Sequence, residues 1–204
     1  MLMPEWRRMA RLVSGQIHVG SVDCQRFQTF CHSVGVRGYP ELRLYSAGSR
    51  KTHQFTTYNG WHRDSQSLRS WVLSSLPRAS VDLTPDLFRT LVLEGNQHWV
   101  LDFYAPWCGP CQHFAPEFEV LARSIKTEVQ AGKVDCQAHY QLCQAAGISA
   151  YPTVRFYPHQ GGARMVFGGD DVNSREAEVI ADIIRQRLDK LKPPGFNSKT
   201  KDEL

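Results

Sequence analysis

The sequence has no apolar run long enough to cross a membrane as a helix, and it has no block of basic residues. Its 24 Lys and Arg residues against 20 Asp and Glu residues leave a net charge of only +4. The basic residues are scattered and are not interleaved with aromatic residues, a pattern that argues against nucleic-acid binding. From these absences we expect neither membrane insertion nor a nucleic-acid partner.

A pair of cysteines at a predicted helix start is the most informative feature that is present. Trp107-Cys108-Gly109-Pro110-Cys111 follows the apolar run 99–104 and opens the amphipathic segment 112–125. Because unpaired N–H groups at a helix start favour a thiolate, we expect Cys108 to lie at the exposed end as the nucleophile. Cys111, one turn further on, is close enough to form a disulfide with it and release what it has captured. The pattern predicts a reversible dithiol/disulfide pair that needs no other cofactor.

Two other interpretations of this cysteine pair are half of a zinc site and a structural disulfide. Cys136 and Cys143 would supply the other half of a zinc site. The predicted strand, turn and helix around Cys108 and Cys111 favour redox chemistry instead, and we expect no metal.

The sequence also contains an internal repeat. Val-Asp-Cys-Gln at 22–25 recurs at 134–137, a shift of 134 − 22 = 112. The same shift, without gaps, relates further residues: Cys31 to Cys143, Gly35 to Gly147, and Tyr39-Pro40 to Tyr151-Pro152. Two copies of one domain are therefore expected. The counterparts of Cys108 and Cys111 would fall at 108 − 112 = −4 and 111 − 112 = −1, so the first copy has no redox pair in this sequence.

The motifs of the second copy resemble those of the thioredoxin and protein disulfide isomerase family. Pro116 follows Cys111 by five residues, as in the active-site helix of thioredoxins, and Tyr151-Pro152-Thr153 resembles their cis-proline turn. Across nearly its whole length the sequence is similar to the last two thioredoxin-like domains of family members that join a DnaJ domain to thioredoxin domains. The resemblance implies an α/β protein with tandem thioredoxin folds, one complete domain preceded by one incomplete domain.

The expected organisation is a truncated thioredoxin-like domain at 1–75, a linker at 76–80, a complete domain at 81–191 and a flexible tail at 192–204. For the complete domain we expect the order βαβαβαββα, with strands at 81–83, 98–104, 132–135, 153–157 and 164–167, and helices at 84–95, from Cys108 to 125, at 137–146 and at 174–191. For the first copy we expect helices at 4–13, up to Gly35 and up to Leu73, and strands at 17–22, 42–45 and 53–57. Because the counterparts of the first two strands are missing, we expect this copy not to form a stable thioredoxin domain by itself.

The resemblance implies roles for three charged residues. Asp102, in the apolar run 99–104, matches the buried acid that exchanges a proton with the resolving thiol, here Cys111. Lys133 matches the lysine that pairs with this acid, and Arg175 matches an arginine that swings toward the resolving cysteine. An Asp exposed to water, a solvated Lys and a surface Arg are the simpler alternatives.

The same resemblance places a substrate surface around Cys108. It implies that Trp107, Gly109 and Pro110 flank the nucleophile and that the Tyr151 backbone pairs with an incoming strand. Pro152 is expected to be cis beside the nucleophile, with Pro40 as its non-catalytic copy. The family also implies two structural disulfides, Cys136 with Cys143 and Cys24 with Cys31.

The last four residues, Lys201, Asp202, Glu203 and Leu204, form an ER-retention signal at the C-terminus. We therefore expect residence in the lumen of the endoplasmic reticulum, where disulfides persist, and the KDEL receptor as a partner. Residues 1–15 do not form a signal peptide, because three arginines interrupt the only candidate region. We expect the sequence to be incomplete at its N-terminus.

The activity that the resemblance implies is thiol–disulfide exchange, mainly reduction of non-native disulfides in misfolded proteins during folding or ER-associated degradation. Pro110 favours the reductase, because oxidising disulfide isomerases commonly carry His there. Misfolded client proteins are the expected partners. The resemblance adds ER degradation lectins and the lumenal heat-shock chaperone, the latter through a J domain that this sequence lacks. The alternatives are a disulfide isomerase or oxidase and a non-catalytic adaptor that binds clients.

Overall fold

The computed structural model describes residues 2–46, 48, 54–159 and 166–191. The chain divides into two compact units, Met1–Pro77 and Arg78–Leu204. The boundary lies within the expected linker, and each unit is described by itself. Among the described residues, no helix is long and apolar enough to span a membrane.

The second unit is built on a five-stranded sheet with the strand order β3-β5-β4-β6-β7. Its strands are β3 (Val81–Asp82), β4 (Trp99–Tyr104), β5 (Gln130–Asp135), β6 (Thr153–Tyr157) and β7 (Asp170–Asp171). The central strand, β4, pairs in parallel with β5 and antiparallel with β6. With the intervening helices the order is βαβαβαββα, which confirms the expected thioredoxin fold.

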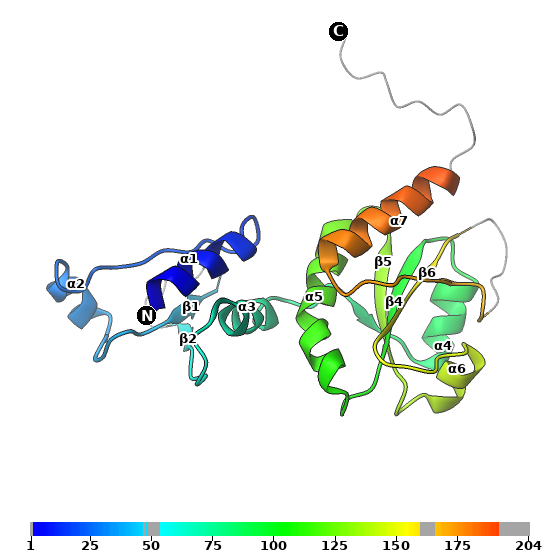
Figure 1. The fold of residues 1–204 in the computed structure, drawn as a ribbon, viewed down its shortest axis with the longest axis horizontal. Coiled ribbons are helices and arrows are strands. Elements are labelled where there is room, and N and C mark those ends of the chain that lie inside the picture. Colours follow the sequence, from blue (N-terminus) through cyan, green and yellow to red (C-terminus); the bar gives the residue numbers. More distant parts are fainter. Residues whose placement is uncertain (1, 47, 49–53, 160–165, 192–204) are drawn as a thin grey trace, which may run out of the picture. The chain divides into compact units, whose positions relative to one another are not determined.

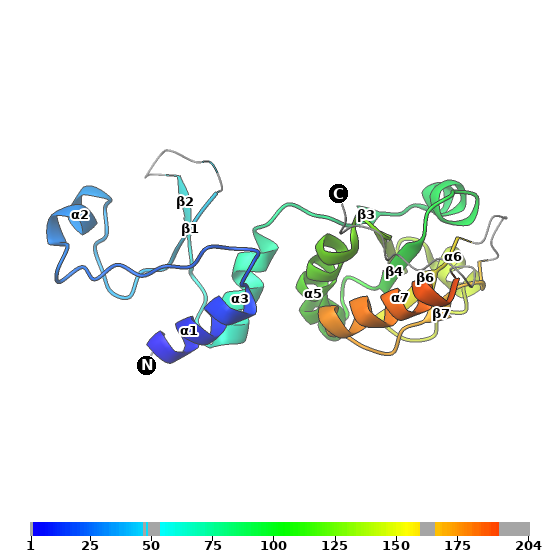
Figure 2. The ribbon, with the colours of Figure 1, turned by 90° about the horizontal axis from the view of Figure 1, so that it is seen from above.

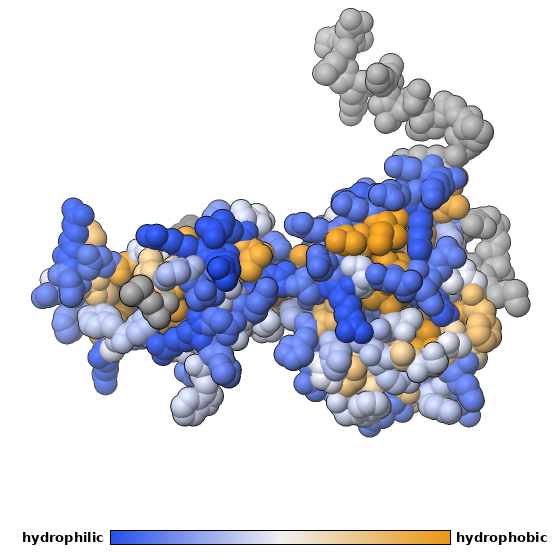
Figure 3. All heavy atoms as spheres, in the orientation of Figure 1, coloured by the Kyte–Doolittle hydropathy of each residue, from blue (hydrophilic) through white to orange (hydrophobic). Residues whose placement is uncertain are grey.

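Helices cover both faces of this sheet (Figures 1 and 2). On one face lie α5 (Gly109–Ile125) and α7 (Ala177–Leu191), and on the other lie α6 (Tyr140–Ala145) and the π-helix η1 (Phe88–Leu93), which continues α4 (Pro85–Leu87). The Thr84 hydroxyl caps α4 by accepting a hydrogen bond from the Leu87 N–H. On the face drawn in Figure 3, hydrophobic side chains of this unit gather around α7.

The alternation of side chains along β4 decides which helices each residue meets. Trp99, Leu101 and Phe103 pack with η1 and α6, whereas Val100 packs with α5 and α7. Successive side chains of a strand point to opposite faces, so Asp102 shares the α5 face with Val100. The acid is thus directed toward the helix that begins beside Cys108.

One expected strand of the second unit is wrong. Residues 164 and 165 lie outside the described residues, and Val166 and Phe167 form a turn. The edge strand is Asp170–Asp171, which pairs with Arg155 and Phe156 of β6. An ion pair of 2.6 Å between the Arg155 Nε and an Asp171 carboxylate oxygen favours this register. Because the pairing depends on two charged residues, the apolar pattern of the sequence does not predict this strand.

The first unit has three helices and two short strands among its described residues. These are α1 (Leu2–Leu12), α2 (Gln28–Ser33), β1 (Arg43–Tyr45), β2 (Phe55–Thr57) and α3 (Ser65–Ser74). β1 and β2 pair antiparallel, and α1 packs on α3 with Met9, Leu68 and Val72 buried. The Glu5 carboxylate also accepts a hydrogen bond of 2.8 Å from the Ser65 N–H.

The expected strand at 17–22 is also wrong, because this segment has no partner strand. Its counterpart in the second unit, β5, pairs with β3 on one side and β4 on the other. The described part of the first unit has no counterpart of either strand, and 17–22 is extended but unpaired. Instead, a groove of about 600 Å³ lies between α1, residues 20–22 and β1. The counterparts of these segments flank β4 in the second unit.

Candidate active site

Cys108 and Cys111 form a disulfide at the N-terminal end of α5, with their Cα atoms 5.2 Å apart. Cys108 is the N-cap residue, and its sulfur accepts a hydrogen bond of 3.2 Å from the Cys111 N–H. An N–H group of the first helical turn therefore points at the Cys108 sulfur. After reduction this arrangement stabilises a thiolate at Cys108.

The expectation that Cys108 is exposed needs correction. Cys108 is 6% exposed and Cys111 is 3% exposed in the disulfide form. The reason is local packing, because Ala105, Tyr104 and Tyr151 surround the two sulfurs. Cys108 remains the more accessible of the two, but the difference is small.

The Tyr151–Pro152 peptide bond is cis, and the loop that carries it lies against the redox pair. The rings of Tyr151 and Trp107 meet edge to face, 6.1 Å apart, and Trp107 is 69% exposed. Above Gly109 the space is open, since a Cβ atom there would meet no atom within 4 Å. Pro110 stands in the first turn of α5, where no intrahelical N–H is needed. These residues form an open aromatic surface beside a recessed disulfide.

Asp102 is buried in β4 on the sheet face that α5 covers, with 1% of its area exposed, so the alternative of an Asp in water is wrong. Among the described residues, neither of its carboxylate oxygens has a hydrogen-bond partner. Burial raises the pKa of Asp102 to about 7, and the charge of Lys133 opposes this rise. The group therefore changes its protonation state near neutral pH, as a carrier of the Cys111 proton requires.

Lys133 lies directly opposite Asp102 in the pairing of β4 with β5. Its ammonium group stands over the ring of Tyr104, 4.7 Å from the ring centroid. Among the ion pairs of the described residues, none joins Lys133 to Asp102. Lys133 therefore acts on the acid through its field, and a cation–π contact holds its side chain.

Arg175 is exposed in the segment between β7 and α7. Within the described part of the chain, its guanidinium makes no hydrogen bond or ion pair, and the structure does not bring it to the cysteines. The movement toward Cys111 that the family resemblance implies thus stays a prediction. Arg63, its counterpart in the first unit, is exposed as well.

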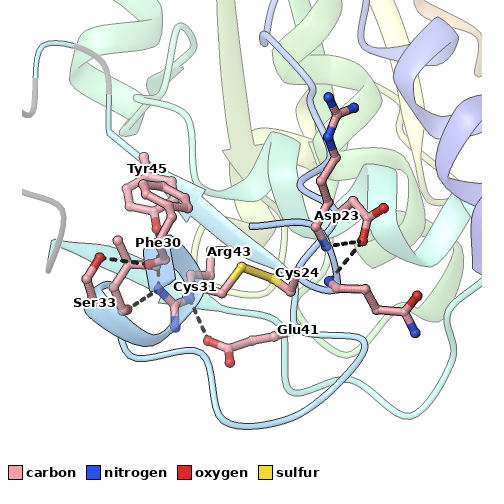
Figure 4. The surroundings of a disulfide bond; sticks show 11 residues. Asp23, Cys24, Phe30, Cys31, Ser33, Glu41, Arg43 and Tyr45 are labelled. Carbon is pink, nitrogen blue, oxygen red and sulfur yellow. Dashed lines mark hydrogen bonds and ion pairs between the residues drawn. A yellow bond between two sulfur atoms is a disulfide. The ribbon is translucent and has the colours of Figure 1, made fainter. Parts of the chain in front are cut away.

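The remaining four cysteines form two disulfides of equal sequence separation. Cys136–Cys143 joins the end of β5 to α6, and Cys24–Cys31 joins the matching segments of the first unit (Figure 4). The first of these bridges is buried on both sides, with Cys136 2% and Cys143 1% exposed. Tyr39–Pro40, the counterpart of the turn at Pro152, is also cis. Across the described ranges, no group of three or more His, Cys, Asp or Glu residues is arranged to hold a metal ion.

Sequence reasoning missed Arg155. This side chain is 7% exposed, and it donates hydrogen bonds of 2.6 Å to the Asp171 carboxylate and to the Ala146 carbonyl. Two signals were available: a charged residue stands inside the apolar strand 153–157, and the repeat places Arg43 at the same position of the first copy. The retention signal at 201–204 lies outside the described residues.

Comparisons with known proteins place the chain in a family. The thioredoxin family model matches residues 1–74 and 79–185. DnaJ homolog subfamily C member 10 of Homo sapiens is 54% identical over 203 residues, which cover all of this chain and 25% of that protein. Protein disulfide isomerase-like 2-2 of Oryza sativa subsp. japonica is 31% identical over all of this chain and 54% of its own length.

Solved structures agree with this assignment. A crystal structure of ERdj5, form I, superposes with a TM-score of 0.83 at 54% identity, covering 94% of this chain and 26% of that one. The Trx4 domain of ERdj5 gives a TM-score of 0.52 at 55% identity, covering 56% of this chain and 99% of that domain. The chain spans about a quarter of the length of the DnaJ homologs that it matches. The chain belongs to the thioredoxin family.

Proposed function

We propose that this chain is a thiol–disulfide oxidoreductase that mainly reduces non-native disulfides of misfolded proteins. The observation that carries the proposal is the Cys108–Cys111 pair beside a cis-proline loop, at the start of the helix that covers the face of the buried Asp102. The similarity to disulfide isomerase-like proteins and to ERdj5 supports it.

The proposed reaction begins with the reduced pair. The Cys108 thiolate attacks one sulfur of a client disulfide, and the other client sulfur leaves as a thiolate. Cys111 gives its proton to Asp102 and attacks the Cys108 sulfur of the mixed disulfide. The client leaves with two thiols, and the enzyme keeps the disulfide seen in this structure. A small-molecule or protein dithiol must then return two electrons to the pair.

Residues at the rim of the pair serve binding rather than electron transfer. The exposed Trp107 ring and the Tyr151 backbone receive the client chain. The open space at Gly109 lets a client disulfide approach the Cys108 sulfur. These residues would contact the extended backbone and the apolar side chains of a client, which suits clients of varied sequence.

The proposed location is the ER lumen. The C-terminal Lys201-Asp202-Glu203-Leu204 supports it, and so do relatives of the disulfide isomerase class. The KDEL receptor, misfolded clients, degradation lectins and the lumenal heat-shock chaperone are the proposed partners. The last of these would bind through a J domain, which this chain does not contain.

Reduction of insulin tests the activity. With dithiothreitol as the electron source, the chain should precipitate insulin B chains faster than dithiothreitol alone. Cys108→Ser should return the rate to that background, and Cys24→Ser in the first unit serves as the control. A Cys108→Ser variant as fast as the unaltered chain would favour the non-catalytic adaptor instead.

A further inference from the structure

Arg155 joins three elements around the cis-proline loop. From β6 its Nη1 donates to the carbonyl of Ala146, the last residue before the loop, and its Nε donates to Asp171 of β7. The loop runs over residues 147–152 and returns to β6 two residues before Arg155. One planar guanidinium therefore ties the start of the loop to the strand that follows its end.

The first unit contains the same device. Arg43, its counterpart at 155 − 112 = 43, donates from Nη1 to the carbonyl of Val34, and 34 is 146 − 112. The length of this bond is 2.6 Å, as for Arg155 and Ala146. Figure 4 shows Arg43 beside the Cys24–Cys31 bridge, with its Nε directed at Glu41. The carboxylate that pairs with the arginine differs between the two units, whereas the hydrogen bond from the arginine to the backbone carbonyl is present in both.

The rest of the loop start is also identical in both units. Ile148 N–H donates to the Cys143 carbonyl over 2.9 Å, as Val36 N–H does to the Cys31 carbonyl. Gly147 and Gly35 both have positive φ, which lets the chain turn away from the helix. The Arg–carbonyl bond is thus part of a repeated frame that sets where the cis-proline loop leaves the helix.

In the second unit this frame ends at the reactive pair. Tyr151, near the far end of the loop, packs against Cys108 and Cys111 and meets the Trp107 ring. Arg155 is paired with Leu101 of β4, so it points to the opposite face of the sheet from Asp102, and it is not among the residues that pack around the two sulfurs. Its effect on the chemistry must pass through the position of the loop.

We propose that Arg155 is a positioning residue for client capture, which holds the backbone of Tyr151 and Pro152 in register with an incoming client strand next to Cys108. The inference rests on the proposed function and deepens it. The loop binds the client backbone but takes no part in electron transfer. Loss of the Arg155 hydrogen bonds therefore weakens client binding equally in the ground state and in the transition state. The loop 147–152 carries no charged residue, so the pH dependence of Cys108 reactivity toward a small reagent is set at the start of α5 rather than by the loop.

The test uses the full chain and a peptide disulfide that carries a fluorophore and a quencher on either side of the bond, with dithiothreitol as reductant. Arg155→Met should raise KM about tenfold, which corresponds to about 1.4 kcal/mol of lost binding, with kcat within about twofold. The midpoint pH of Cys108 alkylation by iodoacetamide in the reduced chain should not change. Arg43→Met, the matched change in the unit without a redox pair, should leave KM, kcat and alkylation unchanged.

Thermal unfolding separates positioning from folding. If Arg155→Met loses its cooperative melt, Arg155→Lys replaces it, and this variant should give an intermediate KM because an ammonium group cannot span both acceptors. An unchanged KM in a folded variant, a shifted midpoint pH of Cys108 alkylation, or loss of folding in both variants would overturn the proposal. If the unaltered chain reduces no peptide disulfide, the proposed function itself falls, and that result is distinct from each of these.

Discussion

At the residue scale, the burial of Asp102 couples the chemistry of the site to pH. Its carboxyl group has a pKa raised to about 7, chiefly by burial, with Lys133 working in the opposite direction. Below this pH the carboxyl group is protonated and cannot take the Cys111 proton. Above it the carboxylate accepts that proton and the mixed disulfide resolves. The release step should therefore accelerate as the pH rises through about 7.

The same burial makes a stability prediction. The folded-state pKa lies above the unfolded value, so the folded chain binds the proton more tightly and loses stability as the pH rises from about 4 to about 7. With a folded pKa of about 7 and an unfolded pKa of about 3.9, this group removes about 2 to 3 kcal/mol between pH 5 and pH 8. Asp102→Asn should lack this loss, as measured by denaturant unfolding of both oxidised chains at the two pH values. Equal pH dependence in the two chains would contradict the burial argument.

At the element scale, we expect the start of α5 to set the direction of electron flow. Pro110 offers no imidazolium to stabilise the Cys108 thiolate, so we expect the disulfide form to be relatively favoured and the pair to be reducing. Its potential should lie between about −180 mV for disulfide isomerase and about −270 mV for thioredoxin. Pro110→His should raise the potential, as measured by equilibration of both chains in glutathione buffers. A potential above −180 mV in the unaltered chain, or no rise with His, would make oxidase or isomerase the better name.

The disulfide that holds α6 should differ in lability from the one at α5. Cys136–Cys143 lies inside the core formed by η1, β4 and α6, whereas Cys108–Cys111 lies at a helix end under an open surface. After a mild glutathione wash, alkylation should label Cys108 and Cys111 but not Cys136. Labelling of Cys136 to the same extent, by peptide mass spectrometry, would show that it is a second redox pair rather than a structural bridge.

Elements were predictable from the sequence where a local pattern dictated them. The apolar run of β4, the Thr84 cap and the periodicity of α7 all appear in the printed residues. Elements that depend on distant partners were not predictable. Residues 17–22 do not form a strand because they lack a neighbouring strand. The position of β7 depends on the ion pair between Arg155 and Asp171. Similarly, the position of Lys133 over the Tyr104 ring follows from side-chain packing between two strands, which no spacing rule encodes.

At the scale of the whole molecule, the two units should differ greatly in independent stability. The first unit keeps a two-stranded sheet and leaves a groove of about 600 Å³ where the second unit has its central strand. Few hydrophobic side chains are buried in the described part of this unit, namely Met9, Val13, Cys31, Leu42, Leu68, Val72 and Leu73. Such a small core leaves little to offset the entropy of folding, since even a whole domain has a net stability of only about 5 to 15 kcal/mol. Residues 1–75 expressed alone should therefore show no sharp melt by circular dichroism, whereas a cooperative transition would refute this expectation.

The central claim, that Cys108 captures clients and Cys111 releases them, is tested most directly by trapping. Cys111→Ser should accumulate mixed disulfides with client proteins, because the sulfur that resolves them is gone, and mass spectrometry of the linked peptides should place the client on Cys108. Cys108→Ser should trap nothing. If clients attach through Cys111 in the Cys108→Ser chain, and not through Cys108 in the Cys111→Ser chain, the assignment of the two sulfurs is wrong.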